Sequence, residues 1–417
     1  MQKIIFAALL ITFLAFSGYH LTFKQFKLPL FARKFYLTGT EFLFFGLLLG
    51  PHFFNIIDIE TLKSLDSFTM FLPGWIGLLF GLQFDILKLR RFPIEFLIGA
   101  IIESVLTFII VFTGISIFFA FIFANYQFLT ISTALTLASA AACTAPTGLA
   151  LMTNSSIVCC QNTVKLLQYI SSIDGIIALL IYAMAFFFHP FISASNLFVF
   201  EFVTRILITL VVSAGFIILF SFYLSWRRDE NELILITLGM IVLMGGAAML
   251  LNFSPLLLNF IVGFFVVNIS REKERLINLL MGLEKPVYLL LLIFLGVSWH
   301  SVSIPVLLGA AAYCLFRIIG KITGGYLVTR IFSGMQEHPP RLGFGLLSPG
   351  GLPMAIFLDF QNGFPNTQTS IAVSLALIAV ILNDIISPHM LGRLLIPDNG
   401  SINTDKADMG KNEQIGS

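Results

Sequence analysis

Apolar runs follow one another along this chain almost without interruption, from residue 4 to residue 394. Most are long enough to cross a bilayer as a helix, which takes about 20 mostly apolar residues. Only 11% of the 417 residues are charged, whereas soluble domains carry about a quarter. No interval between the runs could hold a soluble domain, which needs at least about 50 residues. The sequence therefore predicts an all-α polytopic membrane protein.

Charge and motif content exclude several classes of function. With 24 Lys+Arg against 22 Asp+Glu, the chain lacks the basic excess of a nucleic-acid-binding protein. It has no phosphate-binding Gly-Lys loop and no dinucleotide fingerprint, and its six histidines lack metalloprotease spacing. An intramembrane aspartyl protease would need a second membrane aspartate in a Gly-x-Gly-Asp context, and this sequence has none. We therefore expect neither an enzyme nor a cofactor, and we expect the four cysteines to be reduced.

Charged residues, Pro, Asn and Gly divide the apolar runs into thirteen candidate helices. They cover residues 3–18, 36–50, 64–84, 94–124, 128–153, 163–188, 197–225, 232–251, 254–269, 286–299, 302–330, 342–360 and 367–394. The first is expected to be a retained helix rather than a cleaved signal peptide, since no A-x-A-like site follows it. If the helices alternate in direction, nineteen of the 24 basic residues fall on one side of the membrane. Lys and Arg accumulate in cytoplasmic loops, so the N-terminus is expected outside and the C-terminus in the cytoplasm.

An odd number of helices permits two inverted sets of six around one connecting helix. On this interpretation residues 1–396 form a transmembrane domain and residues 397–417 a short polar cytoplasmic tail. The first repeat covers about 3–188, the linker helix about 197–225, and the second repeat about 231–394.

Two polar clusters interrupt the fifth helix of each predicted set, Ser139–Gly148 and Gly345–Pro353. Backbone that leaves a helix inside a bilayer must face protein, water or an ion. Paired interruptions in inverted halves mark the binding site of a secondary transporter. Two simple proline kinks are the alternative. The residues that we expect at the crossing of two broken helices are Pro146, Gly148, Ser348, Pro349, Gly350 and Pro353.

Asp174 is the deepest carboxylate within the predicted spans, with about ten residues of its own span on either side. An ionisable group at bilayer depth costs on the order of 2.5–3.5 kcal/mol, so it requires a function or a partner. Burial and a nearby cation shift the proton affinity of a carboxyl group in opposite directions, which allows a proton and a metal ion to compete for it. A structural ion pair with Arg317 or Lys321 is the alternative, and it does not exclude the first interpretation.

Four further charges fall inside predicted spans. Arg317 and Lys321 share a helix face because they are four residues apart. Lys321 could pair there or extend to the interface. Glu103 could be a second ligand or the partner of Lys321, whereas Asp384 is expected to be structural or to lie at an interface. Two other carboxylates, those of Glu41 and Asp85, are expected at the membrane surface.

Several motifs together resemble the cation:proton antiporter superfamily, in particular the monovalent cation:proton antiporter-2 branch with its sodium/proton exchangers and Kef-type membrane domains. The resemblance extends over about residues 4–394. The motifs are Thr38–Pro51, Gly74–Asp85, Cys143–Gly148, Ser172–Gly175, Ser254–Gly263, Glu284–Pro286 and Arg317–Gly320.

The resemblance implies about thirteen helices in two inverted repeats, with a mobile core, a dimerisation scaffold and two crossed broken helices. It implies that Asp174 is the shared cation and proton site and that Arg317 is the basic residue of the later helix. The family has Asn or Asp immediately before this aspartate, but this chain has Ile173. Ser172, Thr144 or Thr147 could supply the missing oxygen.

The function implied is exchange of a monovalent cation, sodium or potassium, for protons across the cell (inner) membrane by a homodimer. The residues expected to serve it are Asp174, Thr144, Ser172 and Thr147, with supporting charges on Arg317, Lys321 and Glu103. A channel-like potassium efflux pathway, or a carrier of another solute on the same fold, is the alternative. The sequence does not distinguish the cation, because selectivity among oxygen ligands depends on cavity size and field strength.

Overall fold

The computed structural model describes residues 2–23, 39–122, 131–145, 161–188, 198–225, 229–270, 272–299, 303–332, 339 and 341–395. Within these ranges the regular structure is entirely helical. The helices are α1 (Gln2–Phe23), α3 (Thr40–Leu49), α4 (Ile59–Ser64), α5 (Asp66–Leu82), α6 (Ile86–Leu89), α7 (Ile94–Ile122), α8 (Ile131–Ala142), α10 (Gln161–Phe188), α11 (Phe198–Ser225), α12 (Glu230–Leu250), α13 (Pro255–Ile269), α14 (Lys273–Val297), α15 (Ile304–Ile331), the 3-10 helix η3 (Leu342–Leu346), α16 (Gly351–Gly363) and α17 (Thr367–Leu395). Seven of them are long and apolar enough to span a membrane.

The predicted all-α membrane fold is confirmed, with two kinds of difference in detail. The tenth helix, predicted at 286–299, is α14 and begins at Lys273, with Pro286 inside it. Its first turns are amphipathic and bury Leu276 and Leu280, which are four residues apart, so they continue the helix despite their charges. The short helices α4 and α6 were not predicted.

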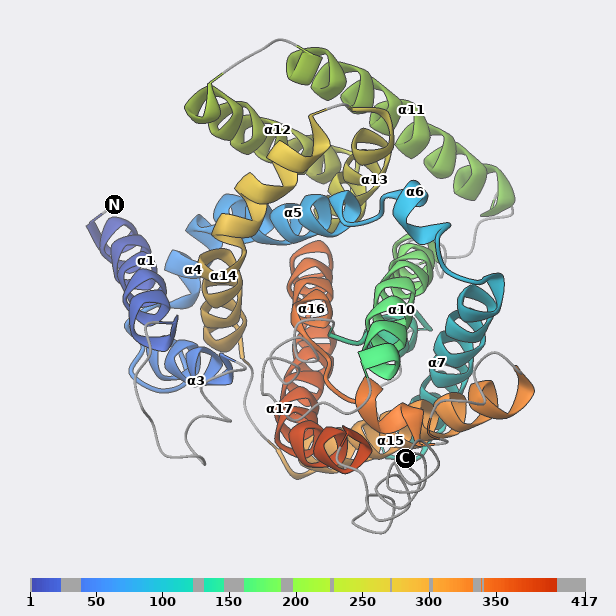
Figure 1. Ribbon diagram of the computed structural model, residues 1–417. Coiled ribbons are helices and arrows are strands. Elements are labelled where there is room, and N and C mark those ends of the chain that lie inside the picture. The colour runs from blue at the N-terminus through green and yellow to red at the C-terminus, as the bar shows by residue number, and fades with distance from the viewer. Residues whose placement is uncertain are drawn as a thin grey trace, which may run out of the picture.

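The helices gather into two bundles, which Figure 1 shows side by side. We define the core bundle as α7, α8, α10, α15, η3 and α17, whose members contact one another extensively. The scaffold bundle consists of α1, α3, α5, α11, α12, α13 and α14. Helix α16 lies between the two bundles and contacts α5, α13 and α14 of the scaffold as well as α8 and α17 of the core.

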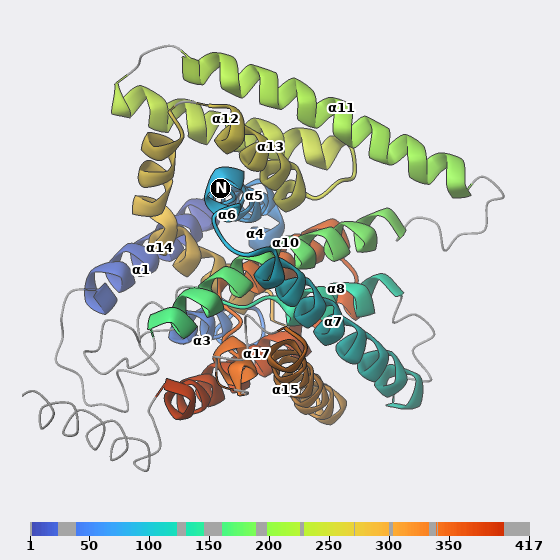
Figure 2. The same cartoon turned by 45° about the vertical axis from the view of Figure 1, so that its right-hand side comes forward.

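Helix α11 lies along the outer edge of the scaffold bundle (Figure 2). Its side chains Val211 and Ile218 are 70% and 71% exposed in the isolated chain. A helix that is apolar on its exposed face suits a lipid environment rather than water.

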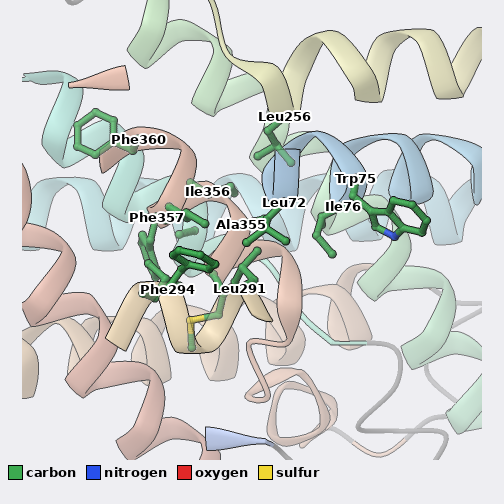
Figure 3. Packing of buried hydrophobic residues seen from close by; sticks show 14 of the residues in the cluster. Leu72, Trp75, Ile76, Leu256, Leu291, Phe294, Ala355, Ile356, Phe357 and Phe360 are labelled. Atoms are coloured by element: carbon green, nitrogen blue, oxygen red, sulfur yellow. The ribbon is translucent and has the colours of Figure 1, made fainter. Parts of the chain in front are cut away.

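An apolar seam joins α16 to the scaffold bundle. Phe357 of α16 is fully buried, as are Leu72 of α5, Leu256 of α13 and Leu291 of α14 in the same cluster (Figure 3). Such side chains pack without directional bonds, so contact between α16 and the scaffold bundle depends here on buried apolar surface.

Candidate functional site

Two broken segments meet in the interior of the molecule. Helix α8 ends at Ala142 and continues as non-helical backbone to Ala145, while η3 is followed by non-helical backbone up to Gly350, the N-cap of α16. The Ala145 N–H donates to the Ser348 carbonyl oxygen at 2.8 Å. This bond pairs one backbone group of each broken segment that has no partner within a helix.

Gly350 allows the two segments to approach this closely. Its backbone angles, φ 73° and ψ −163°, belong to a region that is essentially restricted to glycine. A Cβ atom at this position would lie 2.6 Å from the Cβ of Ala145. Pro349 lies in the non-helical stretch, and Pro353 lies in the first turn of α16, where a missing N–H costs little. Pro146, Thr147 and Gly148 lie outside the described residues.

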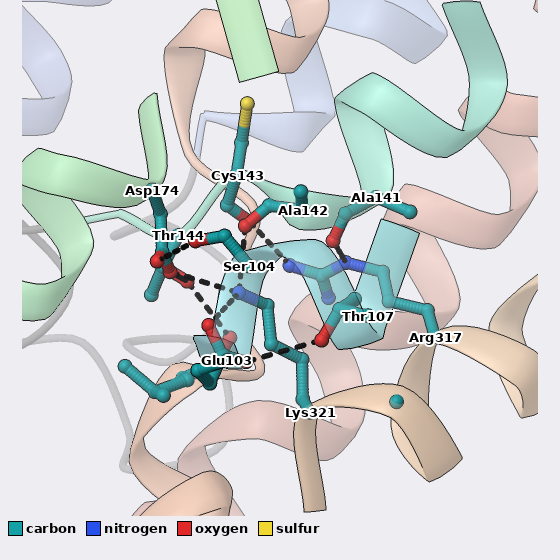
Figure 4. A network of polar contacts seen from close by, with 12 residues as sticks. Glu103, Ser104, Thr107, Ala141, Ala142, Cys143, Thr144, Asp174, Arg317 and Lys321 are labelled. Carbon is teal, nitrogen blue, oxygen red and sulfur yellow. Dashed lines mark hydrogen bonds and ion pairs between the residues drawn. The ribbon is translucent and has the colours of Figure 1, made fainter. Parts of the chain in front are cut away.

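Asp174 on α10 lies against this crossing and is completely buried. Thr144, in the non-helical end of the first broken segment, donates its hydroxyl to Oδ2 of Asp174 at 2.9 Å. Ser104 on α7 donates to Oδ1 (Figure 4). Each oxygen of the carboxylate therefore accepts a hydroxyl hydrogen bond, the arrangement expected for its charged form.

Lys321 on α15 is the cation nearest to Asp174 among the described residues. Its Nζ atom lies 2.8 Å from Oδ2 of Asp174 and 3.2 Å from Oε2 of Glu103. It also donates to the carbonyl oxygen of Ala142 at 2.6 Å, at the end of α8. The interpretation that Lys321 extends to the interface is therefore wrong: the ammonium uses all three donors internally and is fully buried.

Two glycines bring Lys321 and Glu103 together. Gly320 and Gly324 lie one turn apart on α15, where added Cβ atoms would approach Thr107 and Glu103 of α7 to 3.0 Å. Small residues at this spacing let two membrane helices approach closely. Glu103 also accepts a hydrogen bond from the Thr107 hydroxyl at 3.1 Å.

Arg317 has a different role from Lys321, although both lie on the same helix face. Its guanidinium donates to the carbonyl oxygens of Ala141 at 3.1 Å, of Cys143 at 2.9 Å and of Leu347. Ala141 and Cys143 belong to the first broken segment (Figure 4), and Leu347 belongs to the second. A buried cation at the C-terminal end of α8 satisfies carbonyls that the helix leaves open. Arg317 therefore binds the crossing itself, and Lys321, not Arg317, forms the ion pair with Asp174.

The structure does not bring Ser172 to Asp174. The Ser172 hydroxyl donates to the Gln168 carbonyl oxygen of its own helix at 3.0 Å. Ile173, which occupies the position of the family's second polar residue, is 4% exposed and packs in an apolar cluster with Leu166 and Ile170. Ser104 and Thr144 supply the hydroxyls instead. Sequence reasoning missed Ser104, although its place next to Glu103 in a membrane span was a usable signal.

The other buried or half-buried carboxylates of the described residues make no hydrogen bond to Asp174, Glu103 or Lys321, although Asp384 interacts electrostatically with Arg317. Both carboxylate oxygens of Glu41, in the first turn of α3, are buried inside the protein, and its expected place at the membrane surface stays a prediction. Asp85 is only 4% exposed and pairs with Lys273 at 2.7 Å. Asp384 on α17 is partly buried. A further carboxylate, that of Asp359 on α16, was not identified from the sequence at all and is 1% exposed.

Together these features define a polytopic membrane protein with a charged site buried where two broken segments cross. The sequence matches no protein-family model and no curated protein. Its structure is similar to the solved structure of the sodium proton antiporter MjNhaP1 from Methanocaldococcus jannaschii at pH 8. The TM-score is 0.64 at 16% identity, with 95% of this chain and 100% of that chain covered. The fold is thus the sodium/proton antiporter fold that the motifs implied.

Proposed function

We propose that this protein is a secondary antiporter that exchanges a monovalent cation, sodium or potassium, for protons. The observation that carries the proposal is the full burial of Asp174 at the crossing, with Lys321 Nζ 2.8 Å from its carboxylate. Burying a charged carboxylate inside a membrane protein costs free energy, and this cost is expected where the carboxylate has a function in transport.

The Lys321 ammonium marks the place of the transported cation. A monovalent metal ion that enters beside Oδ2 of Asp174 would displace Nζ, which would keep its contact with Glu103 at 3.2 Å. Thr144 Oγ1 and the carbonyl oxygen of Ala142 already point to the same place and are suitable ligands for a hard cation. When the metal ion leaves, either Lys321 returns or a proton takes its place on Asp174.

Two carboxylates and two cations balance the charge of the resting site. Glu103, Asp174, Arg317 and Lys321 sum to zero when all are ionised, and all four are buried. When Asp174 carries a proton instead, a metal ion that binds its carboxylate must displace that proton, because a site of low dielectric constant disfavours the additional positive charge of holding both. Such competition is the chemical requirement of cation:proton exchange.

Alternating access would come from movement of the core bundle against the scaffold bundle. The site belongs entirely to core helices and their broken segments, and α16 contacts the scaffold through an apolar seam. We propose a homodimer in the cell (inner) membrane, with the N-terminus outside and the C-terminus in the cytoplasm. The charge asymmetry of the sequence supports this orientation.

The test is cation-dependent proton release from proteoliposomes, followed with an interior pH dye while sodium or potassium is added. Wild type is compared with Asp174→Asn and with Glu60→Gln, which changes an exposed carboxylate on α4. We expect a signal with at least one cation, lost in Asp174→Asn and retained in Glu60→Gln. Exchange that persists in Asp174→Asn would refute the proposal, and silence of wild type with both cations would direct the search to another solute.

A further inference from the structure

Asp359 forms a second buried polar site, six residues after the broken segment Gly345–Pro353. Its Oδ2 atom accepts hydrogen bonds from the Tyr182 hydroxyl at 2.7 Å and from the Ser254 hydroxyl at 2.5 Å. Its Oδ1 atom faces the Leu256 N–H at 3.3 Å. The side chain is 1% exposed, so none of these contacts is a surface feature.

These contacts connect the two bundles. Tyr182 belongs to α10 of the core, whereas Ser254 is the N-cap of α13 in the scaffold and also accepts a hydrogen bond from the Leu257 N–H at 3.0 Å. Asp359 on α16 therefore holds both the core and the first turn of a scaffold helix. Elsewhere α16 contacts the scaffold mainly through apolar side chains, and Asp359 adds directional hydrogen bonds to that seam.

The surroundings of Asp359 are suited to a group that gains and loses a proton. The Tyr182 hydroxyl, the Ser254 hydroxyl and the Leu256 N–H all donate to the carboxylate, and the N-terminus of α13 contributes partial positive charge. Both features stabilise the ionised form of Asp359. Among the described residues, however, no cation pairs with it, and burying an unpaired charge is costly. The helices around α16 are α5, α8, α10, α13, α14 and α17. In their described parts, Tyr182 is the one titratable side chain that interacts with Asp359.

We propose that Asp359 is a second proton-binding site, separate from Asp174, and that its ionised form fastens the core bundle to the scaffold bundle. A proton on Asp359 removes the negative charge that strengthens the hydrogen bonds from Tyr182 and Ser254, and a proton on Oδ2 also requires one of these hydroxyls to turn and accept. The first turn of α13 is then held to α16 less tightly. Protonation thus lowers the barrier to movement between the bundles.

The site lies at one end of the scaffold, and this placement gives the proton a source. Ser254 caps the start of helix α13, and Asn268 near its other end donates to the Phe84 carbonyl oxygen next to Asp85. Asp359 is therefore at the opposite end of α13 from the basic residues Lys88 and Lys273. The charge asymmetry assigns those segments to the cytoplasm, so we place Asp359 at the outer end of α13 and assign its proton to the outside.

Infrared spectroscopy of the purified protein in lipid tests the proton site without transport. The C=O stretch of protonated carboxyl groups is recorded as the pH is lowered, for wild type, Asp359→Asn, Asp174→Asn and Asp384→Asn. We expect a titrating band that is absent in Asp359→Asn alone. If Asp359→Asn removes no band, or removes one that does not change with pH, the proposal is overturned.

Tyr182→Phe and Ser254→Ala keep Asp359 and remove one donor each. If Asp359→Asn does not fold, the infrared titration of these two variants tests the same proposal. Each is expected to move the midpoint of the band to higher pH by about one unit, the effect of one lost hydrogen bond to a charged group. An unmoved midpoint in both variants would show that these donors do not hold the ionised form.

The fastening itself is tested by exchange, and this part depends on the proposed antiport. In wild type we expect exchange to slow as external pH rises and Asp359 ionises, whereas in Asp359→Asn this decline should flatten. An unchanged pH profile in Asp359→Asn would overturn the fastening role. If wild type exchanges nothing, the antiport proposal fails, but the infrared result still decides whether Asp359 binds a proton.

Discussion

Lys321 Nζ lies between two buried carboxylates, 2.8 Å from Asp174 and 3.2 Å from Glu103. The two acids come from different helices, α10 and α7, and the ammonium comes from a third, α15. Because Lys321 contacts both acids, it can stay paired with Glu103 when a metal ion binds Asp174. This relationship underlies the first prediction.

Removal of the ammonium should make folding depend on a metal cation. Lys321→Gln leaves Asp174 and Glu103 without their shared counter-charge, which should cost about 3–5 kcal/mol of stability. Sodium or potassium should restore part of this loss, because a metal ion can occupy the place of Nζ. Thermal unfolding in detergent is measured with sodium, potassium or choline chloride at equal ionic strength. Equal stabilisation of Lys321→Gln by choline would contradict this expectation.

Two serines near Asp174 should differ in their effect on cation binding. Ser104 donates to the Asp174 carboxylate, whereas Ser172 donates only to the backbone of its own helix. Ser104→Ala should raise the cation concentration for half-maximal exchange about tenfold, the effect of losing one hydrogen bond to a charged group. Ser172→Ala serves as the matched control and should behave as wild type. Similar values for the two variants would remove Ser104 from the site.

Arg317 should be irreplaceable by lysine. Its guanidinium reaches three carbonyl oxygens of the two broken segments, and an ammonium on a flexible chain cannot reproduce that planar geometry. Arg317→Lys should lower stability by about 3 kcal/mol, since buried carbonyls lose their donors. Arg330→Lys, on the exposed end of the same helix, is the control for thermal unfolding. An Arg317→Lys variant as stable as Arg330→Lys would show that the crossing does not depend on the guanidinium.

Gly350→Ala should disrupt the crossing of the broken segments. The backbone of Gly350 lies in a region that costs other residues about 1–3 kcal/mol, and the new methyl group would lie 2.6 Å from the Cβ of Ala145. We expect a lower unfolding temperature and loss of exchange. Gly246→Ala in α12 meets no atom within 4 Å and should be as stable as wild type or more so. Full exchange in Gly350→Ala would mean that the crossing tolerates a wider spacing.

The ion pair between Asp85 and Lys273 should make stability depend on pH at the acidic end. Burial raises the pKa of Asp85, but hydrogen bonds from Lys273 and the Leu87 N–H, with the charges of Lys273 and Lys88, together hold that pKa below its ordinary value. The unfolded chain therefore binds this proton more readily than the folded chain. The contribution is complete above about pH 4, the ordinary range of an aspartate, and is lost as the pH falls through the lower folded value.

Asp85→Asn should accordingly remove about 1–2 kcal/mol at neutral pH and flatten the acid limb of the stability curve. Thermal unfolding between pH 3 and pH 7 compares it with wild type and with Asp66→Asn, another carboxylate at an end of α5. A difference between wild type and Asp85→Asn that persisted unchanged at the lowest pH would contradict the assigned linkage.

Much of the fold was accessible from the sequence because a bilayer imposes strong rules. A helix must satisfy its own backbone in lipid, so apolar length alone predicted most helices to within a few residues. The extension of α14 before Pro286 was missed because its charged first turns bury Leu276 and Leu280 through amphipathic spacing. The Pro and Gly clusters also predicted where helices break, since backbone freed in a membrane requires a special environment.

The sequence by itself thus determined the membrane class, the approximate spans, and the depth of Asp174 within its span. The tertiary structure alone decided that Lys321 pairs with Asp174 while Arg317 binds backbone carbonyls, that Ser104 rather than Ser172 reaches the carboxylate, and that Asp359 joins the two bundles. The reason is geometric. Hydropathy and helical period fix the length and faces of each helix, but the partner of a buried charge depends on which faces meet and at what height, and segments from distant parts of the chain set both.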